Sequence, residues 1–355
     1  MSKHRSVTIV DIAEAAGVSI ATVSNVLNRR KVPMSEETIR KVERTAEELG
    51  YRRNVMAASL SRKKSYELGL IVPGFIGYYG LFAEEMERTA HRFGYHLSVF
   101  SAGGYDPEME RRHLDVLLQR RVDGLFCHGL AMSTETTRQI VSDGTPLVLF
   151  NGWNWPEDIA VGAVNLDFAG GCVEAVHHLV KQGCRSLFYL ERSTAHETNK
   201  QRLLGFRKGI AEAGEEVCSF VIEGDKQPMH EIVRMTQDMG GGHGPIGILA
   251  FDDLVALRFM SAVAEQGYRV PEDYKIFGIN NDIISSSCYP QITTLDIPYS
   301  QQAQWAVSLM LRQLGEEDKL AGEAMMEIPE AGNAGNEIRI PLTLIQRLST
   351  STAFR

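Results

Sequence analysis

The segment GVSIATVSNVLNRR, residues 17–30, carries small hydroxyl, amide and apolar side chains, and no ionisable group lies between Gly17 and Arg29. Small and amide side chains can approach the floor of a DNA groove closely, whereas long charged side chains remain on the phosphates. An Asn amide pairs with the edge of adenine, and small apolar groups contact the methyl group of thymine. The segment is therefore expected to contact bases; the alternative is a polar surface helix of a small bundle.

Two short helices are expected to position this segment. Thr8, with Asp11 three residues later, is typical of a capping box before a helix that ends at Gly17. Ser19 can cap a second helix over residues 20–28. A helix, a tight glycine turn and a second helix form the helix-turn-helix arrangement, whose second helix enters the major groove of DNA.

A third helix, from Ser35 to about Gly50, is expected to complete the core of this head. On the second helix, Val23, Val26 and Leu27 form the inward face. The side chains predicted to meet DNA are the caps and the outward face of that helix: Thr8, Ser19, Ile20, Ala21, Thr22, Ser24, Asn25 and Asn28.

The charge of the chain is divided between its two ends. Residues 1–64 hold 13 Lys and Arg against 7 Asp and Glu, a net charge of +6, whereas the remaining residues have a net charge of −14. A basic head on an acidic body indicates that the head alone meets a polyanion. A merely solvated basic face is the alternative.

Composition and motifs exclude several classes of protein. Hydrophobic residues at 44% and charged residues at 23% are ordinary for a soluble protein, and no apolar run reaches the length of a membrane span. The first ten residues lack a secretory h-region, so a cytoplasmic protein is expected. Five scattered cysteines predict neither disulfides nor a cysteine zinc site. Adjacent His177 and His178 point apart on a helix and predict no metal site. No nucleophile motif or cofactor motif is present, and GGGHG at 240–244 lacks the Walker ending.

After Ser65 the pattern changes to apolar runs that alternate with helical stretches. The runs include LGLIVP, LSVF, DGLFCHG, PLVLF, SLFYL, IGILAF and KIFGI. Helices are expected over 81–93, 107–120, 168–182, 200–213 and 252–266. Such alternation predicts parallel sheets covered by helices on both faces. Nearly 290 residues favour two lobes over a single sheet.

The head resembles the DNA-binding head of the lactose-repressor (LacI/GalR) family. VTIVDIAEAAGVSIATVSNVLN followed by SEETIRKVERTAEELGYRRN matches the family pattern over some 45 residues. The resemblance implies that Ile20 and Ala21 occupy the two recognition positions. Asn25 stands where the family usually has Arg, so an operator that differs from the common family consensus is expected.

Residues 52–64, RRNVMAASLSRKK, resemble the hinge of this family. The resemblance implies a short helix that forms on DNA and places Leu60 in the minor groove, with Asn54 and Ala57 also on pattern. Arg53 for Pro and Ala58 for Arg depart from that pattern. A disordered basic linker in the absence of DNA is compatible with this assignment.

The body also resembles the family, through phrases such as DFAGGCVEAVHHLVKQG, AFDDLVALRFMSAVAEQGYRVPEDYKIFGINN and PQITTLDIP. The implied fold is an all-α helix-turn-helix head plus an α/β body like a periplasmic sugar-binding protein, with two Rossmann-like lobes and parallel sheets. The expected boundaries are 1–51 for the head, 52–65 for the hinge, 66–350 for the body and 351–355 for a tail.

The resemblance also implies which residues bind an effector in the cleft between the lobes. Arg202 matches the Arg that commonly grips the effector, and Asn151 and Asn280 stand where many members have Asp. Lys226 falls roughly where relatives place an aromatic ring. Structural amides for the two Asn, and a solvated surface Lys, are the alternatives. The further lining candidates are Phe82, Phe168, Asp252 and Tyr299.

Two lost carboxylates and one gained ammonium predict an acidic effector, such as a sugar acid or a sugar phosphate. The resulting prediction is a homodimeric, ligand-responsive regulator, most simply a repressor, that binds a pseudo-palindromic double-stranded DNA operator. An activator or dual regulator of the same family is the alternative. A solute-binding protein without DNA function, and an enzyme on a Rossmann-like body, are disfavoured by the head and by the missing catalytic residues.

Overall fold

The structure is a computed structural model that describes residues 7–28, 32–51, 64–128, 133–153, 155–156, 158–192, 196–240, 242, 244–321 and 337–351. The chain divides into two compact units, residues 1–65 and 66–355. The predicted hinge residues Asn54, Ala57 and Leu60 and the predicted tail after Ser351 lie outside the described residues.

The described part of the N-terminal unit contains three helices, α1 (Ile9–Ala16), α2 (Ile20–Leu27) and α3 (Glu36–Glu48). These bounds confirm the expected helices. Their apolar faces meet in one small core, in which Ile12, Val23 and Val42 are completely buried. The axes of α1 and α2 are bent by 110° across the turn at Gly17, whose φ of 61° suits glycine.

The first lobe of the body is a six-stranded sheet in the order β11-β5-β4-β3-β1-β2. All of its strand pairs are parallel. The strands are β1 (Glu67–Val72), β2 (His96–Ser101), β3 (Gly124–His128), β4 (Leu147–Phe150), β5 (Gly162–Leu166) and β11 (Glu337–Ile340). The helices are α5 (Tyr78–Arg92), α6 (Pro107–Gln119), α7 (Thr134–Ile140) and α13 (Tyr299–Gln313), with 3₁₀ turns η1 (Val141–Asp143) and η2 (Glu317–Lys319).

The second lobe is a six-stranded sheet in the order β12-β10-β9-β8-β6-β7. The strands are β6 (Ser186–Glu191), β7 (Cys218–Glu223), β8 (Ile246–Ala250), β9 (Tyr274–Asn280), β10 (Thr293–Asp296) and β12 (Thr343–Ile345). The helices are α8 (Phe168–Lys181), α9 (His196–Ala213), α10 (Met229–Gly240), α11 (Asp253–Glu265) and α12 (Ile283–Ser287).

Alternate residues of each central strand pack into different cores. Leu187 and Tyr189 of β6 pack in the same core as residues of α8 and α9, whereas Phe188 and Leu190 pack with residues of α10 and α11. A strand that is apolar on both faces needs helices on both sides, which is why these segments are continuous apolar runs in the sequence. The predicted α/β architecture is thereby confirmed.

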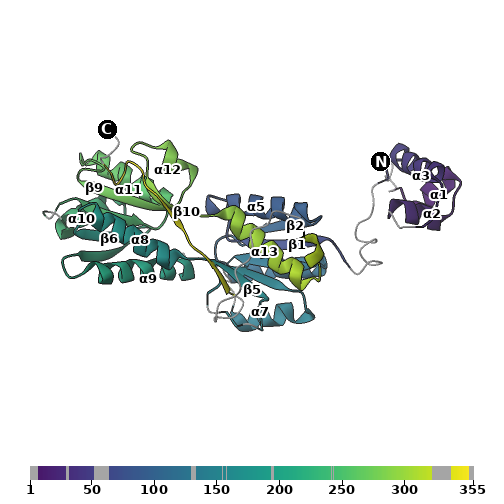
Figure 1. The fold of residues 1–355 in the computed structure, drawn as a ribbon, viewed down its shortest axis with the longest axis horizontal. Helices are drawn as coiled ribbons and strands as arrows, with labels where there is room; N and C mark the ends of the chain where they lie inside the picture. The colour runs from purple at the N-terminus through teal and green to yellow at the C-terminus, as the bar shows by residue number, and fades with distance from the viewer. Residues whose placement is uncertain are drawn as a thin grey trace. The chain divides into compact units, whose positions relative to one another are not determined.

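The chain passes between the two lobes three times: from β5 to α8, from β10 to α13, and from β11 to β12 (Figure 1). The backbone N–H of Asp167 donates to the carbonyl of Ile340 at 2.8 Å and thus joins the first and third crossings. Strand β12 is antiparallel to β10, in contrast to the parallel pairs elsewhere. Because the chain leaves the first sheet at its carboxyl edge and runs straight on, it enters the second sheet in the opposite sense.

The expected helices of the body are present, with two earlier starts. Helix α5 begins at Tyr78 and α9 at His196, three and four residues before the expected positions. Helices α7, α10, α12 and α13 are not among the expected stretches. The cysteines are free thiols, of which three are buried, Cys288 is half-buried and Cys218 is exposed. No single helix of the described chain is long and apolar enough to cross a membrane; α1 and α2 meet that test of length and composition only as a bent pair.

Candidate functional site

Helix α2 is held in place by its N-terminal cap and by its apolar face. The side chain of Ser19 accepts a hydrogen bond from the backbone N–H of Thr22 at 3.0 Å. Val23 and Val26 are buried and Leu27 is half-buried against the core of the head. This burial turns the opposite face outward, so Ser19, Ile20 and Ala21 are exposed, with Ile20 47% accessible.

The remaining predicted DNA contacts of the head are less exposed. Thr22, Ser24, Asn25 and Asn28 are half-buried, and the Asn28 amide donates to the Ser24 hydroxyl at 3.2 Å. An exposed apolar tip followed by hydroxyl and amide groups is a surface suited to the major groove.

Thr8 caps α1 together with Asp11. The backbone N–H and the hydroxyl of Thr8 both donate to the Asp11 carboxylate, at 2.7 and 2.6 Å. The predicted capping box is therefore present. Thr8 has a structural role at this helix end, and its predicted contact with DNA stays a prediction.

The body contains a cavity of about 900 Å³ between its two lobes. Its walls come from the carboxyl ends of strands in both sheets: the segment after β1, His128 of β3, Asn151 after β4, Phe251 and Asp252 after β8, and Asn280 of β9. Carboxyl ends of parallel strands are where open α/β sheets bind ligands. The five predicted residues that line this cavity are Asn151, Phe168, Arg202, Asp252 and Asn280.

Arg202 is the buried cation of the cavity. Its guanidinium carbon lies 4.3 Å from the ring centre of Phe168 and 3.9 Å from that of Phe251, so two aromatic faces enclose the group. Nη1 donates to the Phe251 carbonyl and Nη2 to Asn280 Oδ1 at 3.4 Å. Among the described residues, no carboxylate lies within ion-pair distance of Arg202, although only 3% of the residue is accessible. A buried guanidinium without an anion is arranged to receive one.

Asn151 is bonded to protein groups on both sides of its amide. Its Oδ1 accepts the backbone N–H of Leu166 at 3.1 Å. Its Nδ2 lies 2.9 Å from His128 Nε2 and 3.4 Å from the Tyr78 hydroxyl. The amide thus joins β4 to the end of β5 and to the aromatic wall. This is the role of a structural amide, the alternative to effector binding for Asn151.

The first-lobe wall of the cavity is aromatic and phenolic. The Tyr78 hydroxyl donates to Gln302 Oε1 at 2.9 Å, and the hydroxyls of Tyr79 and Tyr105 are also 2.9 Å apart. Burial raises the pKa of Tyr78, Tyr79 and Tyr105, so all three phenols remain protonated at neutral pH. Burial also lowers the pKa of His128 to about 3, which leaves its imidazole uncharged.

Two carboxylates lie on the second-lobe side. Asp252 caps α11 by accepting the N–H of Val255 at 2.8 Å, and its other oxygen is 3.3 Å from Arg192 Nη1. The charges of Asp252 and Arg192 therefore largely cancel each other within the cavity. Asp282 also lines it, and burial, followed by the neighbouring Asp252 charge, raises its pKa. Asp253, next to Asp252, points away to Thr294, and burial raises its pKa to about 7.

Three predicted effector residues lie outside the cavity lining. Phe82 is completely buried beneath Tyr78, with ring centres 5.7 Å apart. Tyr299 supports the site from behind, because its hydroxyl donates to the Asn280 carbonyl at 3.2 Å. Lys226 follows β7 on the surface, with 60% of its side chain accessible, and pairs with Glu223. The structure does not bring the Lys226 ammonium to the cavity.

Sequence analysis missed several lining residues: Tyr78, Tyr79, Tyr105, His128, Arg192 and Asp282. His128 ends the apolar run GLFCH, and a polar residue at the carboxyl end of a parallel strand is a recognisable signal. The tyrosines lie in loops and a first helical turn, where no spacing rule would select them.

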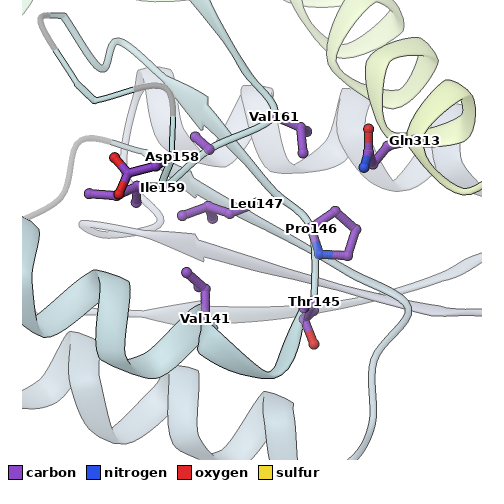
Figure 2. A pocket seen from close by; sticks show the side chains of 10 residues that line it. Val141, Thr145, Pro146, Leu147, Asp158, Ile159, Val161 and Gln313 are labelled. Atoms are coloured by element: carbon purple, nitrogen blue, oxygen red, sulfur yellow. The ribbon is translucent and has the colours of Figure 1, made fainter.

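A smaller cavity of about 350 Å³ lies in the first lobe at the amino ends of β4 and β5 (Figure 2). Figure 2 shows Thr145 and Pro146 before β4, Val161 before β5 and Gln313 of α13 around it. Its charged lining residue, Asp158, already pairs with Arg138 at 2.7 Å. We assign no ligand to it. The described part of the chain also holds no cluster of three or more metal-ligating side chains.

Comparison with known proteins finds a family model that matches part of each unit. Residues 8–54 match the model of bacterial regulatory proteins of the lacI family, and residues 176–350 match that of the periplasmic binding protein-like domain. The chain is 30% identical over 300 residues to the HTH-type transcriptional regulator DegA of Bacillus subtilis (strain 168), which covers 83% of this chain and 87% of DegA.

Two solved structures are similar in fold. A lac repressor dimer bound to operator and the anti-inducer ONPF has a TM-score of 0.79 and 23% identity, over 98% of this chain and 99% of that chain. A periplasmic binding protein/LacI transcriptional regulator from Alkaliphilus metalliredigens QYMF, complexed with D-xylulofuranose, has a TM-score of 0.64 and 24% identity. That match covers 81% of this chain and 100% of the other.

Proposed function

The chain belongs to the LacI family of DNA-binding transcriptional regulators, and from this premise we propose that it is a repressor controlled by a small acidic carbohydrate derivative. The effector occupies the cavity between the lobes. The observation that carries this proposal is Arg202, a buried guanidinium that lines the cavity and has no carboxylate partner among the described residues. A carboxylate or a phosphate would complete its donor set.

Other features of the cavity support a polyhydroxylated ligand. Phenolic hydroxyls on one lobe, together with amide and carboxylate groups on the other, provide donors and acceptors for hydroxyls. Aromatic rings offer apolar faces to a sugar ring. The Alkaliphilus metalliredigens neighbour is complexed with a sugar, D-xylulofuranose.

We place operator binding in the head. Its outward α2 face supplies base contacts, and its net charge of +6 supplies affinity that weakens steeply with salt as counterions are released. A homodimer would present two heads to a pseudo-palindromic operator, and the lac repressor neighbour is a dimer on its operator. Effector binding then changes operator affinity by a coupling of about 1–3 kcal/mol.

A thermal-shift panel of glucose, gluconate and glucose 6-phosphate on the full chain tests the effector class. An acid should raise the melting temperature, and Arg202→Gln should abolish that rise. Arg207→Gln is the matched control, because Arg207 lies exposed on the same helix. Stabilisation by the neutral sugar alone, unchanged in Arg202→Gln, would contradict the acidic class.

Operator binding is tested by selecting bound fragments from random genomic DNA. The selected fragments should carry an inverted repeat, and the stabilising acid should change their affinity for the full chain. Light scattering measures the oligomeric state. A stable monomer at micromolar concentration, or selected fragments without symmetry, would contradict the dimeric operator complex.

A further inference from the structure

Three polar atoms of the cavity residues are buried and have no hydrogen bond to another described residue. They are His128 Nδ1, Arg202 Nε and Asp282 Oδ1. An unpaired polar atom away from water is unfavourable, because it has lost its hydrogen bonds to water. The three residues that carry these atoms line the same cavity, which indicates polar groups that a ligand completes.

The orientation of the Asn151 amide follows from its backbone contact. The N–H of Leu166 is a donor, so the atom 3.1 Å from it must be the Asn151 oxygen. The amide nitrogen therefore faces His128 Nε2, at 2.9 Å. An amide NH₂ only donates, so Nε2 must accept and carries no hydrogen.

The imidazole is neutral, and its proton is therefore on the other nitrogen. Burial lowers the pKa of His128 to about 3 against the opposing effect of a hydrogen bond with its own backbone, and the nearby Arg202 charge lowers it further. The rings of Tyr78 and Tyr79 pack edge-on against the imidazole, with centroids 5.2 and 4.7 Å away. A neutral imidazole with an unprotonated Nε2 has its hydrogen on Nδ1.

We infer that His128 is a specificity-determining residue of the effector cavity, held by Asn151 as the Nδ1–H tautomer to donate to an acceptor oxygen of the effector. This inference rests on the proposed function, because it assumes that the cavity binds a ligand. Asn151 is then a positioning residue and not itself a ligand residue. Arg202 Nε adds a second donor and Asp282 Oδ1 an acceptor. The three atoms together select a hydroxy acid, with at least two acceptor oxygens and one hydroxyl.

The tautomer can be measured without any ligand. Nitrogen-15 NMR of histidine-labelled full chain distinguishes a protonated from an unprotonated ring nitrogen, and His128→Gln assigns the signal by its loss. We expect Nδ1–H between pH 5 and pH 8. Asn151→Asp should reverse the tautomer, because a carboxylate can accept from both Leu166 N–H and Nε2–H. Asn280→Asp, in the same cavity, should leave it unchanged. An Nε2–H tautomer in the wild type would overturn the inference.

Gluconate, a hydroxy acid, is the probe for the contact itself. Titration should shift the His128 Nδ1–H and Arg202 Nε–H signals together, and His128→Leu should weaken gluconate binding by about tenfold. If the Arg202 signal moves alone, the inferred role of His128 is wrong while the proposed function stands. If neither signal moves with gluconate or with glucose 6-phosphate at millimolar concentration, both the acidic effector class and the His128 contact are contradicted, whatever the tautomer.

Discussion

His128 is the last residue of β3, and Asn151 directly follows the neighbouring parallel strand β4. Their side chains are in contact, with 2.9 Å between Asn151 Nδ2 and His128 Nε2. The same amide accepts the N–H of Leu166, one residue before the chain leaves the first lobe. One buried side chain therefore connects the wall of the cavity to a crossing between the lobes.

Replacing Asn151 by Ala should destabilise the body. The substitution leaves the Leu166 N–H and the His128 Nε2 without partners, so the free energy of unfolding should fall by about 2 kcal/mol. Urea denaturation followed by circular dichroism measures the change. Gln139→Ala, at an exposed position of α7, is the control and should change it by less than about 0.5 kcal/mol. Equal values for both variants would contradict the role of this contact.

Replacing Asn25 by Arg should change the base preference of the head. Asn25 lies half-buried on α2, where the family pattern has Arg, and a guanidinium forms a bidentate pair with guanine. Sequences selected by Asn25→Arg from a random duplex library should therefore contain a guanine that the wild type does not select. The variant should prefer this guanine over other bases by about 1–3 kcal/mol. Asn25→Ala separates this gain from simple loss of the amide. If both variants select the wild-type sequence, Asn25 does not contact bases.

The lining residues show which parts of the site were predictable. Arg202 is predictable from the RLLGF motif of α9, and Phe168 and Asp252 lie two residues after the ends of β5 and β8. Such motifs keep their spacing when the loops between elements vary. The family resemblance predicts Lys226 in the cavity through the alignment of a loop. In the structure, the loop after β7 directs this side chain to Glu223 instead. The head was predictable almost to the residue because caps such as Thr8 and Ser19 are local signals.

Lys226→Ala should leave effector binding unchanged, in contrast to the sequence-based expectation. Its ammonium is exposed, pairs with Glu223 and does not line the cavity. Isothermal titration with the acid that stabilises the wild type should give dissociation constants within about twofold of each other, a difference below about 0.5 kcal/mol. Arg202→Lys is the positive control and should weaken binding, because an ammonium lacks the guanidinium fork. A large loss in Lys226→Ala would show that the loop reaches the ligand.

Leu60→Ala should reduce operator binding and DNA bending while the body keeps its fold. Leu60 lies outside the described residues, and the prediction rests on the hinge resemblance. An inserted side chain offsets the few kcal/mol needed to unstack a base step, so its removal should straighten the DNA. A circular-permutation gel assay measures the bend. The adjacent Ser61→Ala variant should bend DNA like the wild type; an unchanged bend in Leu60→Ala would exclude the wedge.

Acidic effectors should bind more tightly as the pH falls from 8 to 5. Burial and the Asp252 charge raise the pKa of Asp282, so this carboxylate takes up its proton at a higher pH than an exposed Asp does. Protonation of Asp282 removes a negative charge that would repel an anion in the cavity. His128, whose pKa is lowered to about 3, stays neutral throughout. Acidification should therefore strengthen the binding of an anion. The gain in affinity should reach up to about tenfold, or about 1.4 kcal/mol.

Titration with gluconate at several pH values measures this gain, because the carboxyl group of gluconate stays ionised over the range. Asp282→Asn should bind tightly at every pH and lose most of the dependence. Asp253, with a pKa raised to about 7, also titrates in this range, but its carboxylate accepts from Thr294 and Asp282 N–H and does not line the cavity. Any dependence that persists in Asp282→Asn is attributed to Asp253. Weaker binding at pH 5 than at pH 8 in the wild type would contradict an anionic ligand beside Asp282.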